Sequence, residues 1–223
     1  MAAFEYAIGQ GYRYLETDVQ VTADGVLVAF HDFNLKRTCG IDRRISDMTW
    51  SEVSAARVDG LAPIPTLEQL LGEWPEARFN IDCKAENAVD ALVAAIRRTS
   101  SIDRVCIGAF SDTRVRRLRG ILGPGLCTAL GPAGVSQLRY GRMSRTGALA
   151  AQVPVRQGPL LVMTDRFVAR AHRLGLQVHV WTIDDPTEIT RLLDMGVDGI
   201  MTDRPAVLRR VLEDRGEWVT GGG

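Results

Sequence analysis

The sequence lacks the features that mark membrane proteins, secreted proteins and nucleic-acid binders. No apolar run approaches the roughly 20 residues that span a bilayer, and Met1 leads directly into an amphipathic helix pattern rather than the basic start of a signal peptide. Lys+Arg and Asp+Glu both number 27, so there is no basic excess of the kind that nucleic-acid binders usually show. We therefore expect a cytoplasmic protein with no transmembrane segment and no nucleic-acid partner.

Cysteine and histidine are also scarce. The sequence has four cysteines and three histidines. The cysteines are too far apart for a zinc pattern or for a small disulfide scaffold, so reduced thiols are expected. A zinc site would use more His or Cys among its ligands, and the chain has only three histidines. The cysteines are Cys39, Cys83, Cys106 and Cys127.

The length and the order of the hydrophobic patterns favour one α/β domain. The chain has 223 residues, of which 46% are hydrophobic, enough for a sizeable core. Strand patterns alternate with helix patterns, which is typical of a parallel sheet. We predict a TIM-type (β/α) barrel formed by residues 1–223 as a single domain. A doubly wound open sheet is the alternative, disfavoured because no Gly-rich dinucleotide turn follows the first strand. The predicted strands are 14–20, 78–83, 105–109, 126–130, 150–153, 177–183 and 199–202.

Residues 14–32 (Y-L-E-T-D-V-Q-V-T-A-D-G-V-L-V-A-F-H-D) carry the first candidate site residues. They are typical of a strand, a tight Asp-Gly turn and a second strand. Glu16 and Asp18 are two apart and share a strand face, and the hairpin brings His31 near them. Two carboxylates with an imidazole close by indicate a metal-assisted acid–base site. The alternative is that the carboxylates are simply the solvated face of a strand.

A second pair of charged residues lies at the end of the strand predicted at 78–83. In N-I-D-C-K, Asp82 and Lys84 share one face. Such a pair can be a plain salt bridge. At a barrel mouth the same pair would serve as a metal ligand and as a contact for phosphate. Glu16, Asp18 and Asp82 would together give a divalent cation three oxygen ligands, which favours Mg²⁺ or Ca²⁺.

The remaining histidines and two aromatic residues are weaker candidates. His172 is predicted inside a helix and His179 inside a strand, so both are expected to be structural or surface residues. Trp181 ends a predicted strand, where it would be either a core residue or an apolar wall for a ligand. Phe110 allows the same two interpretations, and we favour packing in the core or at its rim.

With these residues in place, the chain resembles the glycerophosphodiester phosphodiesterases. The matching stretches run from near the N-terminus to about Pro205, and the first, at residues 14–32, is the most specific. The resemblance implies a TIM barrel with a divalent metal in its mouth. It also implies hydrolysis of glycerophosphodiesters to an alcohol and glycerol 3-phosphate. The other stretches are L-K-R-T, N-I-D-C-K, V-H-V-W-T-I-D-D and G-V-D-G-I-M-T-D-R-P.

The same resemblance implies roles for individual residues. Glu16 and Asp18 match the family's two metal carboxylates. Asp82 stands where the family more often has a Glu as its third metal ligand, and this shorter arm must shift the ion or take a water. His31 matches the second of two catalytic histidines, and Lys84 matches the phosphate-contacting lysine.

The resemblance also implies a role for one aromatic residue. Trp181 matches the aromatic that packs against the glycerol or alcohol moiety. We therefore expect the substrate to be a small glycerophosphodiester.

One departure from the family pattern leaves alternatives open. Family members begin with a strand that carries H-R-G, followed by P-E-N-T, whereas the chain here begins at Met1 inside the expected first helix. We expect a barrel without its first strand and weak or no phosphodiesterase activity, with an upstream-extended chain being active. The alternatives are a non-catalytic barrel that binds metal and phosphodiester, and a phospholipase D-like enzyme acting on lysolipid head groups. The unpaired strand edges would also allow a homo-oligomer.

Overall fold

The structure is a computed structural model that describes residues 1–219. It divides into two compact units, which meet in the chain between Cys127 and Thr128, and each is described by itself. The sequence predicts a frayed tail at 219–223, and this segment lies, from residue 220 onward, outside the described residues. That residues 1–223 form one barrel domain stays a prediction.

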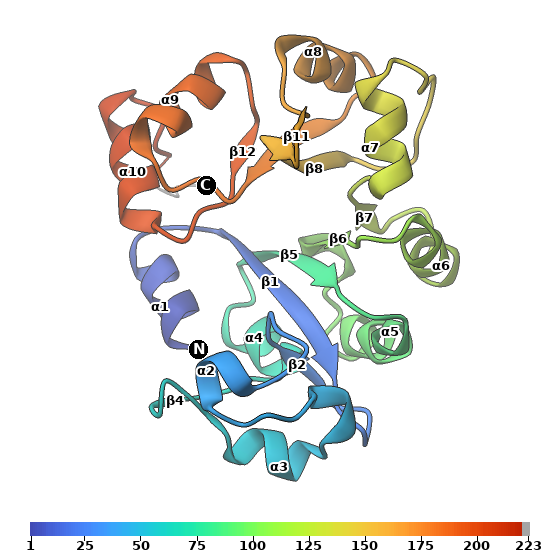
Figure 1. Ribbon diagram of the computed structural model, residues 1–223, viewed down its shortest axis with the longest axis vertical. Helices are drawn as coiled ribbons and strands as arrows, with labels where there is room; N and C mark the ends of the chain where they lie inside the picture. Colours follow the sequence, from blue (N-terminus) through green and yellow to red (C-terminus); the bar gives the residue numbers. More distant parts are fainter. Residues whose placement is uncertain (220–223) are drawn as a thin grey trace. The chain divides into compact units, whose positions relative to one another are not determined.

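The first unit is built on a sheet whose central strands are parallel. The strand order is β2-β1-β5-β6-β7, with β1 parallel to β5 and β5 parallel to β6. Figure 1 shows β1 beside β5, with β2 folded back near its end. The predicted strand 78–83 is confirmed to the residue. The strands are β1 (Tyr14–Val21), β2 (Leu27–Ala29), β5 (Arg78–Cys83), β6 (Val105–Gly108) and β7 (Cys127–Thr128).

The turn between β1 and β2 is confirmed at the Asp-Gly pair. Gly25 has a φ of 86°, a conformation that glycine adopts without the steric cost of a Cβ. The Thr22 hydroxyl donates to Asp24 Oδ1 (2.6 Å) and accepts from the Val26 amide (2.9 Å). These bonds close the hairpin that carries the chain back alongside β1.

Alternate residues of the central strands point to opposite sides of the sheet. Leu15, Val19, Phe79, Ile81 and Ile107 are at most 6% exposed and form a core cluster with the helices of this unit. The predicted apolar stripe of the first helix packs against the same cluster. The opposite face is left for the polar residues of β1 and β5. The helices are α1 (Ala2–Gly9), α4 (Leu67–Glu73), α5 (Val89–Arg98) and α6 (Asp112–Leu122).

The segment between β2 and α4 has a small core of its own. Leu35 and Val53 are fully buried and Ile45 is 1% exposed, and they cluster with Val28 and Phe30 from the β2 end. We call residues 33–65 the insertion. The sequence predicts an irregular connection over 35–65 with one short helix at 51–56, and the structure is more ordered than that. Its elements are α2 (Lys36–Cys39), the 3₁₀ turn η1 (Ile45–Asp47), α3 (Trp50–Ala55), β3 (Arg57–Val58) and β4 (Ala62–Pro63).

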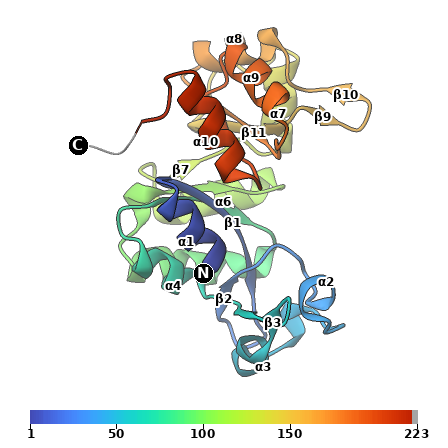
Figure 2. The same ribbon diagram turned by 90° about the vertical axis from the view of Figure 1, so that its left-hand side faces the viewer.

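The second unit repeats the alternation of strands and helices. Its sheet has the order β12-β11-β8, with both pairs parallel. The hairpin of β9 (Arg156–Gln157) and β10 (Leu160–Leu161) projects away from the helices of this unit (Figure 2). Phe167, Val178 and Leu192 are fully buried in its core. The remaining elements are β8 (Ala150–Pro154), β11 (Gln177–Trp181), β12 (Gly199–Ile200), α7 (Pro132–Arg139), α8 (Asp165–Arg173), α9 (Pro186–Asp194) and α10 (Pro205–Asp214).

No helix within residues 1–219 is long and apolar enough to cross a membrane. The predicted α/β alternation and the parallel pairing are confirmed.

Candidate active site

Two carboxylates and a lysine meet on the polar face of the first unit's sheet. Asp18 on β1 and Asp82 on β5 are register partners in the parallel pair, so their side chains leave neighbouring strands at the same level. Lys84, two residues beyond Asp82, places its Nζ 2.6 Å from Asp18 Oδ1 and 3.0 Å from Asp82 Oδ2. The predicted pair on N-I-D-C-K is therefore brought together with a carboxylate from the first motif.

This cluster is largely withdrawn from water. The side chains of Asp18, Asp82 and Lys84 are 12%, 16% and 17% exposed. Burial raises the pKa of Asp18, and the hydrogen bond and charge of Lys84 only partly oppose this. For Lys84, burial favours the neutral amine, but bonding to Asp18 and the charge of Asp82 outweigh it and raise the pKa. The ammonium is thus held charged between two carboxylates.

One carboxylate oxygen of this cluster has no hydrogen-bond partner. Asp82 Oδ1 is buried and accepts no hydrogen bond. A buried carboxylate oxygen usually has a partner, and a hard divalent cation would bind such an atom well. The Asp18–Asp82 pair therefore fits a Mg²⁺- or Ca²⁺-type ion in its donor chemistry.

The third predicted metal ligand is not brought into the same cluster. Glu16 lies on the same face of β1 but is exposed, and its register partner on β5 is Asn80. Across residues 1–219, no group of three or more His, Cys, Asp or Glu side chains is close enough to hold one metal ion. The three-carboxylate ligand set therefore stays a prediction.

His31 is delivered beside this cluster by the hairpin. The Phe30 amide donates to the Asp18 carbonyl (2.9 Å), and the Gln20 side-chain amide donates to the His31 carbonyl (3.3 Å). The imidazole itself is 68% exposed, and its Nδ1 lies 2.7 Å from Asp32 Oδ1. His31 is also close enough for its charge to act on Asp18.

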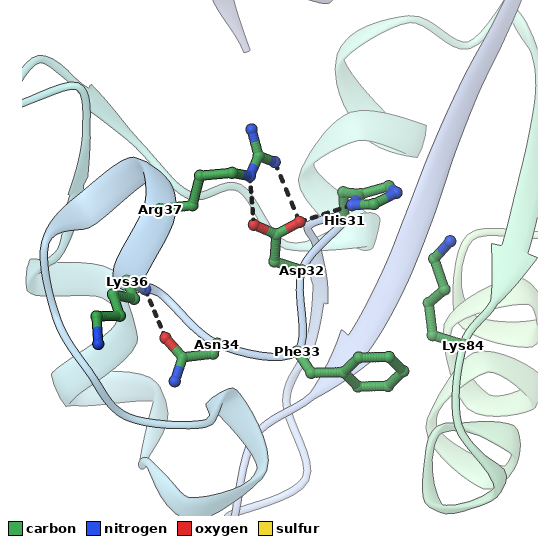
Figure 3. Close-up of a pocket in the computed structure, with 7 residues that line it drawn as sticks. All are labelled: His31, Asp32, Phe33, Asn34, Lys36, Arg37 and Lys84. Carbon is green, nitrogen blue, oxygen red and sulfur yellow. Dashed lines mark hydrogen bonds and ion pairs between the residues drawn. The ribbon is translucent and has the colours of Figure 1, made fainter. Parts of the chain in front are cut away.

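A pocket of about 460 Å³ joins His31 and Lys84. Figure 3 shows Lys84 entering it from the β5 side, facing the ring of Phe33, while His31 and Asp32 form another wall. Phe33 is 50% exposed, so the pocket has one apolar surface among its charges. A cavity with a few convergent polar groups is the form that small-molecule sites usually take. Its lining is His31, Asp32, Phe33, Asn34, Lys36, Arg37 and Lys84.

The other predicted residues lie elsewhere. Trp181 is the last residue of β11, in the second unit, and is half-buried. His172 bonds Asp198 (2.8 Å), and the ring of His179 contacts Gln152 (3.3 Å), while burial lowers its pKa. Both pairings are those of structural residues.

Phe110 is not a core residue. It is 65% exposed, so the core interpretation is wrong, whereas packing at the rim of the core and an apolar wall for a ligand both stay open.

Two residues in the pocket wall make contacts with the site that the sequence did not indicate. Asp32 bonds both His31 and Arg37, and Arg37 holds Asp32 through two nitrogens. Asp32 directly follows His31, which is a usable signal. Arg37 lies within L-K-R-T, a stretch that matches the family but does not itself say what the arginine contacts.

Comparison with known proteins identifies the family of the chain. The chain matches the glycerophosphoryl diester phosphodiesterase family over residues 1–122 and 130–207. It is 40% identical over 227 residues to "Probable glycerophosphodiester phosphodiesterase 2" of Mycobacterium tuberculosis, covering 98% of this chain and 86% of the relative. The chain belongs to the glycerophosphoryl diester phosphodiesterase family, and the resemblance drawn from its motifs is confirmed.

Two further proteins extend the comparison. The chain is 26% identical to "Lysophospholipase D GDPD1" of Rattus norvegicus, covering 96% of this chain and 81% of the relative. A solved structure of an Oleispira antarctica phosphodiesterase in complex with the product sn-glycerol-3-phosphate matches with a TM-score of 0.78. That match covers 95% of this chain and 90% of the other at 18% identity, and it shows the fold alone. The predicted TIM-type α/β fold is confirmed.

Proposed function

We propose that the protein hydrolyses small glycerophosphodiesters, with the help of a divalent cation, to an alcohol and glycerol 3-phosphate. The observation that carries this is the convergence of Asp18, Asp82, Lys84 and His31 around one face of the sheet and one pocket. Membership of the family supports the reaction class. The product bound in the Oleispira antarctica enzyme supports glycerol 3-phosphate as the product to measure.

Asp18 and Asp82 are the proposed holders of the cation, with Glu16 as a third ligand. A bound divalent cation supplies positive charge against the phosphoryl oxygens. The unpartnered Asp82 Oδ1 supports this assignment. Lys84 already lies against both carboxylates, and its retained charge suits it to an anionic phosphodiester in the same pocket.

His31 is the proposed proton-transfer group. Its Nδ1 bonds Asp32, and Figure 3 shows Nε2 turned toward the side of the pocket from which Lys84 enters. Nε2 can therefore take a proton from an attacking hydroxyl or return one to the leaving alcohol. Trp181 stays the proposed aromatic contact of the glycerol or alcohol moiety.

The test is release of glycerol 3-phosphate from glycerophosphocholine and glycerophosphoethanolamine by the purified protein. We expect release with Mg²⁺ or Ca²⁺, suppression by a chelator, and recovery when the cation is restored. His31→Gln is expected to lower kcat by about 10²- to 10⁴-fold, the usual contribution of a general acid–base group. His172→Gln is the matched control because it removes a histidine that bonds only Asp198 among its described side-chain partners. Binding of the diester in calorimetry without release of product would instead support a non-catalytic binding barrel.

Cleavage of lysophospholipid head groups is the second candidate. The relative named "Lysophospholipase D GDPD1" favours it, and Phe33 gives the pocket an exposed apolar surface that an acyl chain could contact. A comparison of kcat/KM for glycerophosphocholine and lysophosphatidylcholine separates the two. If Phe33→Ser lowers kcat/KM for the lysolipid and leaves that for glycerophosphocholine unchanged, the second candidate is supported.

A further inference from the structure

Arg37 makes a two-point contact with a carboxylate in the pocket wall. Its Nε lies 2.7 Å from Asp32 Oδ2 and its Nη2 lies 3.1 Å from Asp32 Oδ1. The planar guanidinium matches the two oxygens of a carboxylate, so this geometry fixes the plane of the carboxylate as well as its position (Figure 3). A lysine at this position would supply the charge without fixing the plane.

The fixed Asp32 carboxylate in turn orients the His31 ring. Its Oδ1 also receives the 2.7 Å bond from His31 Nδ1. The Asp32 side chain is 21% exposed, whereas His31 and Arg37 are 68% and 67% exposed. The best-shielded group of the three is therefore the carboxylate at their centre.

The protonation state of Asp32 determines which nitrogen of His31 carries the hydrogen. Bonds from Arg37 and His31 hold the pKa of Asp32 down to about 2, so the group is a carboxylate at neutral pH and can only accept hydrogen bonds. His31 Nδ1 must then be the donor. In the neutral imidazole this leaves the lone pair on Nε2, the nitrogen turned toward the Lys84 side of the pocket.

The local fold holds Arg37 in place. Leu35 is fully buried in the core of the insertion. Asn34 Oδ1 accepts from the Lys36 amide (2.6 Å), and Lys36 Nζ bonds Asp42 Oδ2 (2.7 Å). These contacts anchor the short helix α2, which carries Arg37, to the rest of the insertion.

We propose that Arg37 is a positioning residue for His31: it holds the Asp32 carboxylate in the plane that fixes His31 with hydrogen on Nδ1 and with Nε2 directed into the pocket. Proton transfer by His31 rests on the proposed function, but its orientation and tautomer do not. Removal of Arg37 frees the carboxylate to rotate, so the ring loses its fixed partner and samples both tautomers.

The test reads the tautomer directly. The full chain is labelled with ¹⁵N, and the ring nitrogens of His31 are assigned by their loss in His31→Gln; only two other histidines are present. At a pH where His31 is neutral, we expect the wild type to show hydrogen on Nδ1. We expect Arg37→Gln and Asp32→Asn to show a mixture or the opposite tautomer, and Arg37→Lys to lie between Arg37→Gln and the wild type.

Arg43→Gln is the matched control. Arg43 also belongs to the insertion and bonds a carboxylate, that of Glu52, at 2.7 Å. No hydrogen bond or ion pair described for it involves Asp32 or His31. Arg43→Gln should therefore leave the His31 tautomer unchanged. Thermal melts of all variants report whether they are folded.

The same variants are also compared by their kcat and KM. Arg37→Gln is expected to lower kcat about 10- to 100-fold, the range typical of groups that orient a reacting or ligating side chain, with KM changed less. Free guanidinium ion should restore part of the kcat of Arg37→Gln and none of that of Asp32→Asn.

The two proposals can fail separately. A wild-type tautomer with hydrogen on Nε2, or a folded Arg37→Gln with an unchanged His31 tautomer, would overturn the positioning role whatever the activity. If the tautomer shifts as expected but the wild type releases no glycerol 3-phosphate, the positioning role stands and the proposed function is wrong.

Discussion

Replacement of Lys84 by Met tests whether its contact with two carboxylates stabilises the fold. Methionine has a similar length, so it keeps most of the packing of the stem and removes the ammonium. The variant leaves Asp18 and Asp82 side by side with no cation between them, in side chains 12% and 16% exposed. Removing one partner of a buried pair costs about 3–5 kcal/mol. Because some solvent reaches this cluster, we expect about 3 kcal/mol.

Lys36→Met is the matched control. Lys36 lies 2.7 Å from Asp42, the same distance class as Lys84 to Asp18, but the two side chains are 69% and 65% exposed. An exposed pair contributes about 0–1 kcal/mol. The two variants therefore lose a similar contact and differ in how far it is shielded from water.

The assay is a thermal melt in a chelator at pH 7.5. For a chain of 150–250 residues, 1 kcal/mol shifts the midpoint by about 2–4 °C, so Lys84→Met should lower it by about 6–12 °C and Lys36→Met by less than about 4 °C. The deficit of Lys84→Met should shrink as the pH is lowered. Burial raises the pKa of Asp18 and Lys84 opposes that rise, so without Lys84 the carboxyl takes up a proton earlier and the repulsion is relieved.

A divalent cation should act on the same pair. Mg²⁺ or Ca²⁺ is expected to raise the midpoint of Lys84→Met more than that of the wild type, because the ammonium no longer competes for the two carboxylates. If Lys84→Met melts no lower than Lys36→Met, burial does not strengthen this contact and the reasoning is refuted.

Three further predictions concern other parts of the chain. A hydrogen bond with Cys106 lowers the pKa of Cys127, and burial raises that of Cys83 to about 12. Iodoacetamide should therefore label Cys127 at a rate that rises with pH and leave Cys83 unlabelled; equal labelling would contradict the assignment. Thr66→Ala removes a capping box on α4 and should cost about 1 kcal/mol in urea unfolding, with Thr66→Ser retaining most of the stability. Gly25→Ala places a Cβ at a φ of 86° and should cost about 1 kcal/mol or more, whereas Gly9→Ala, inside α1, should not destabilise.

The sequence predicted the sheet well because strand periodicity is a local signal. Residues 78–83 alternate R-F-N-I-D-C, and the structure buries Phe79 and Ile81 while Asn80 and Asp82 face the other side. The shared face of Glu16 and Asp18 follows from the same alternation. Register is not local, however, and only the structure shows that Asp82 lies opposite Asp18 whereas Glu16 lies opposite Asn80.

The core of the insertion could not be predicted from the sequence. Its buried residues are single or in pairs separated by longer polar stretches, so no helical or strand period continues beyond one turn. They are Leu35, Ile45, Met48, Val53, Ala56 and Ile64. The position of Arg37 depends on that core and on the turn at Asn34. Its contact with Asp32 could therefore not be predicted from residue spacing.

The separate core of the insertion means that the Asp18–Asp82–Lys84 cluster and the Asp32–Arg37 wall of the pocket need not unfold together. Asp18, Asp82 and Lys84 stand on the sheet, whereas Asp32 and Arg37 are tied to a cluster that could open as a local unit, or foldon, at a lower free energy than the sheet. Amide hydrogen exchange would then be faster in residues 33–65 than in β1 and β5. Damage to this small cluster would then remove the support of the proposed proton-transfer group in a protein whose calorimetric melt still looks native.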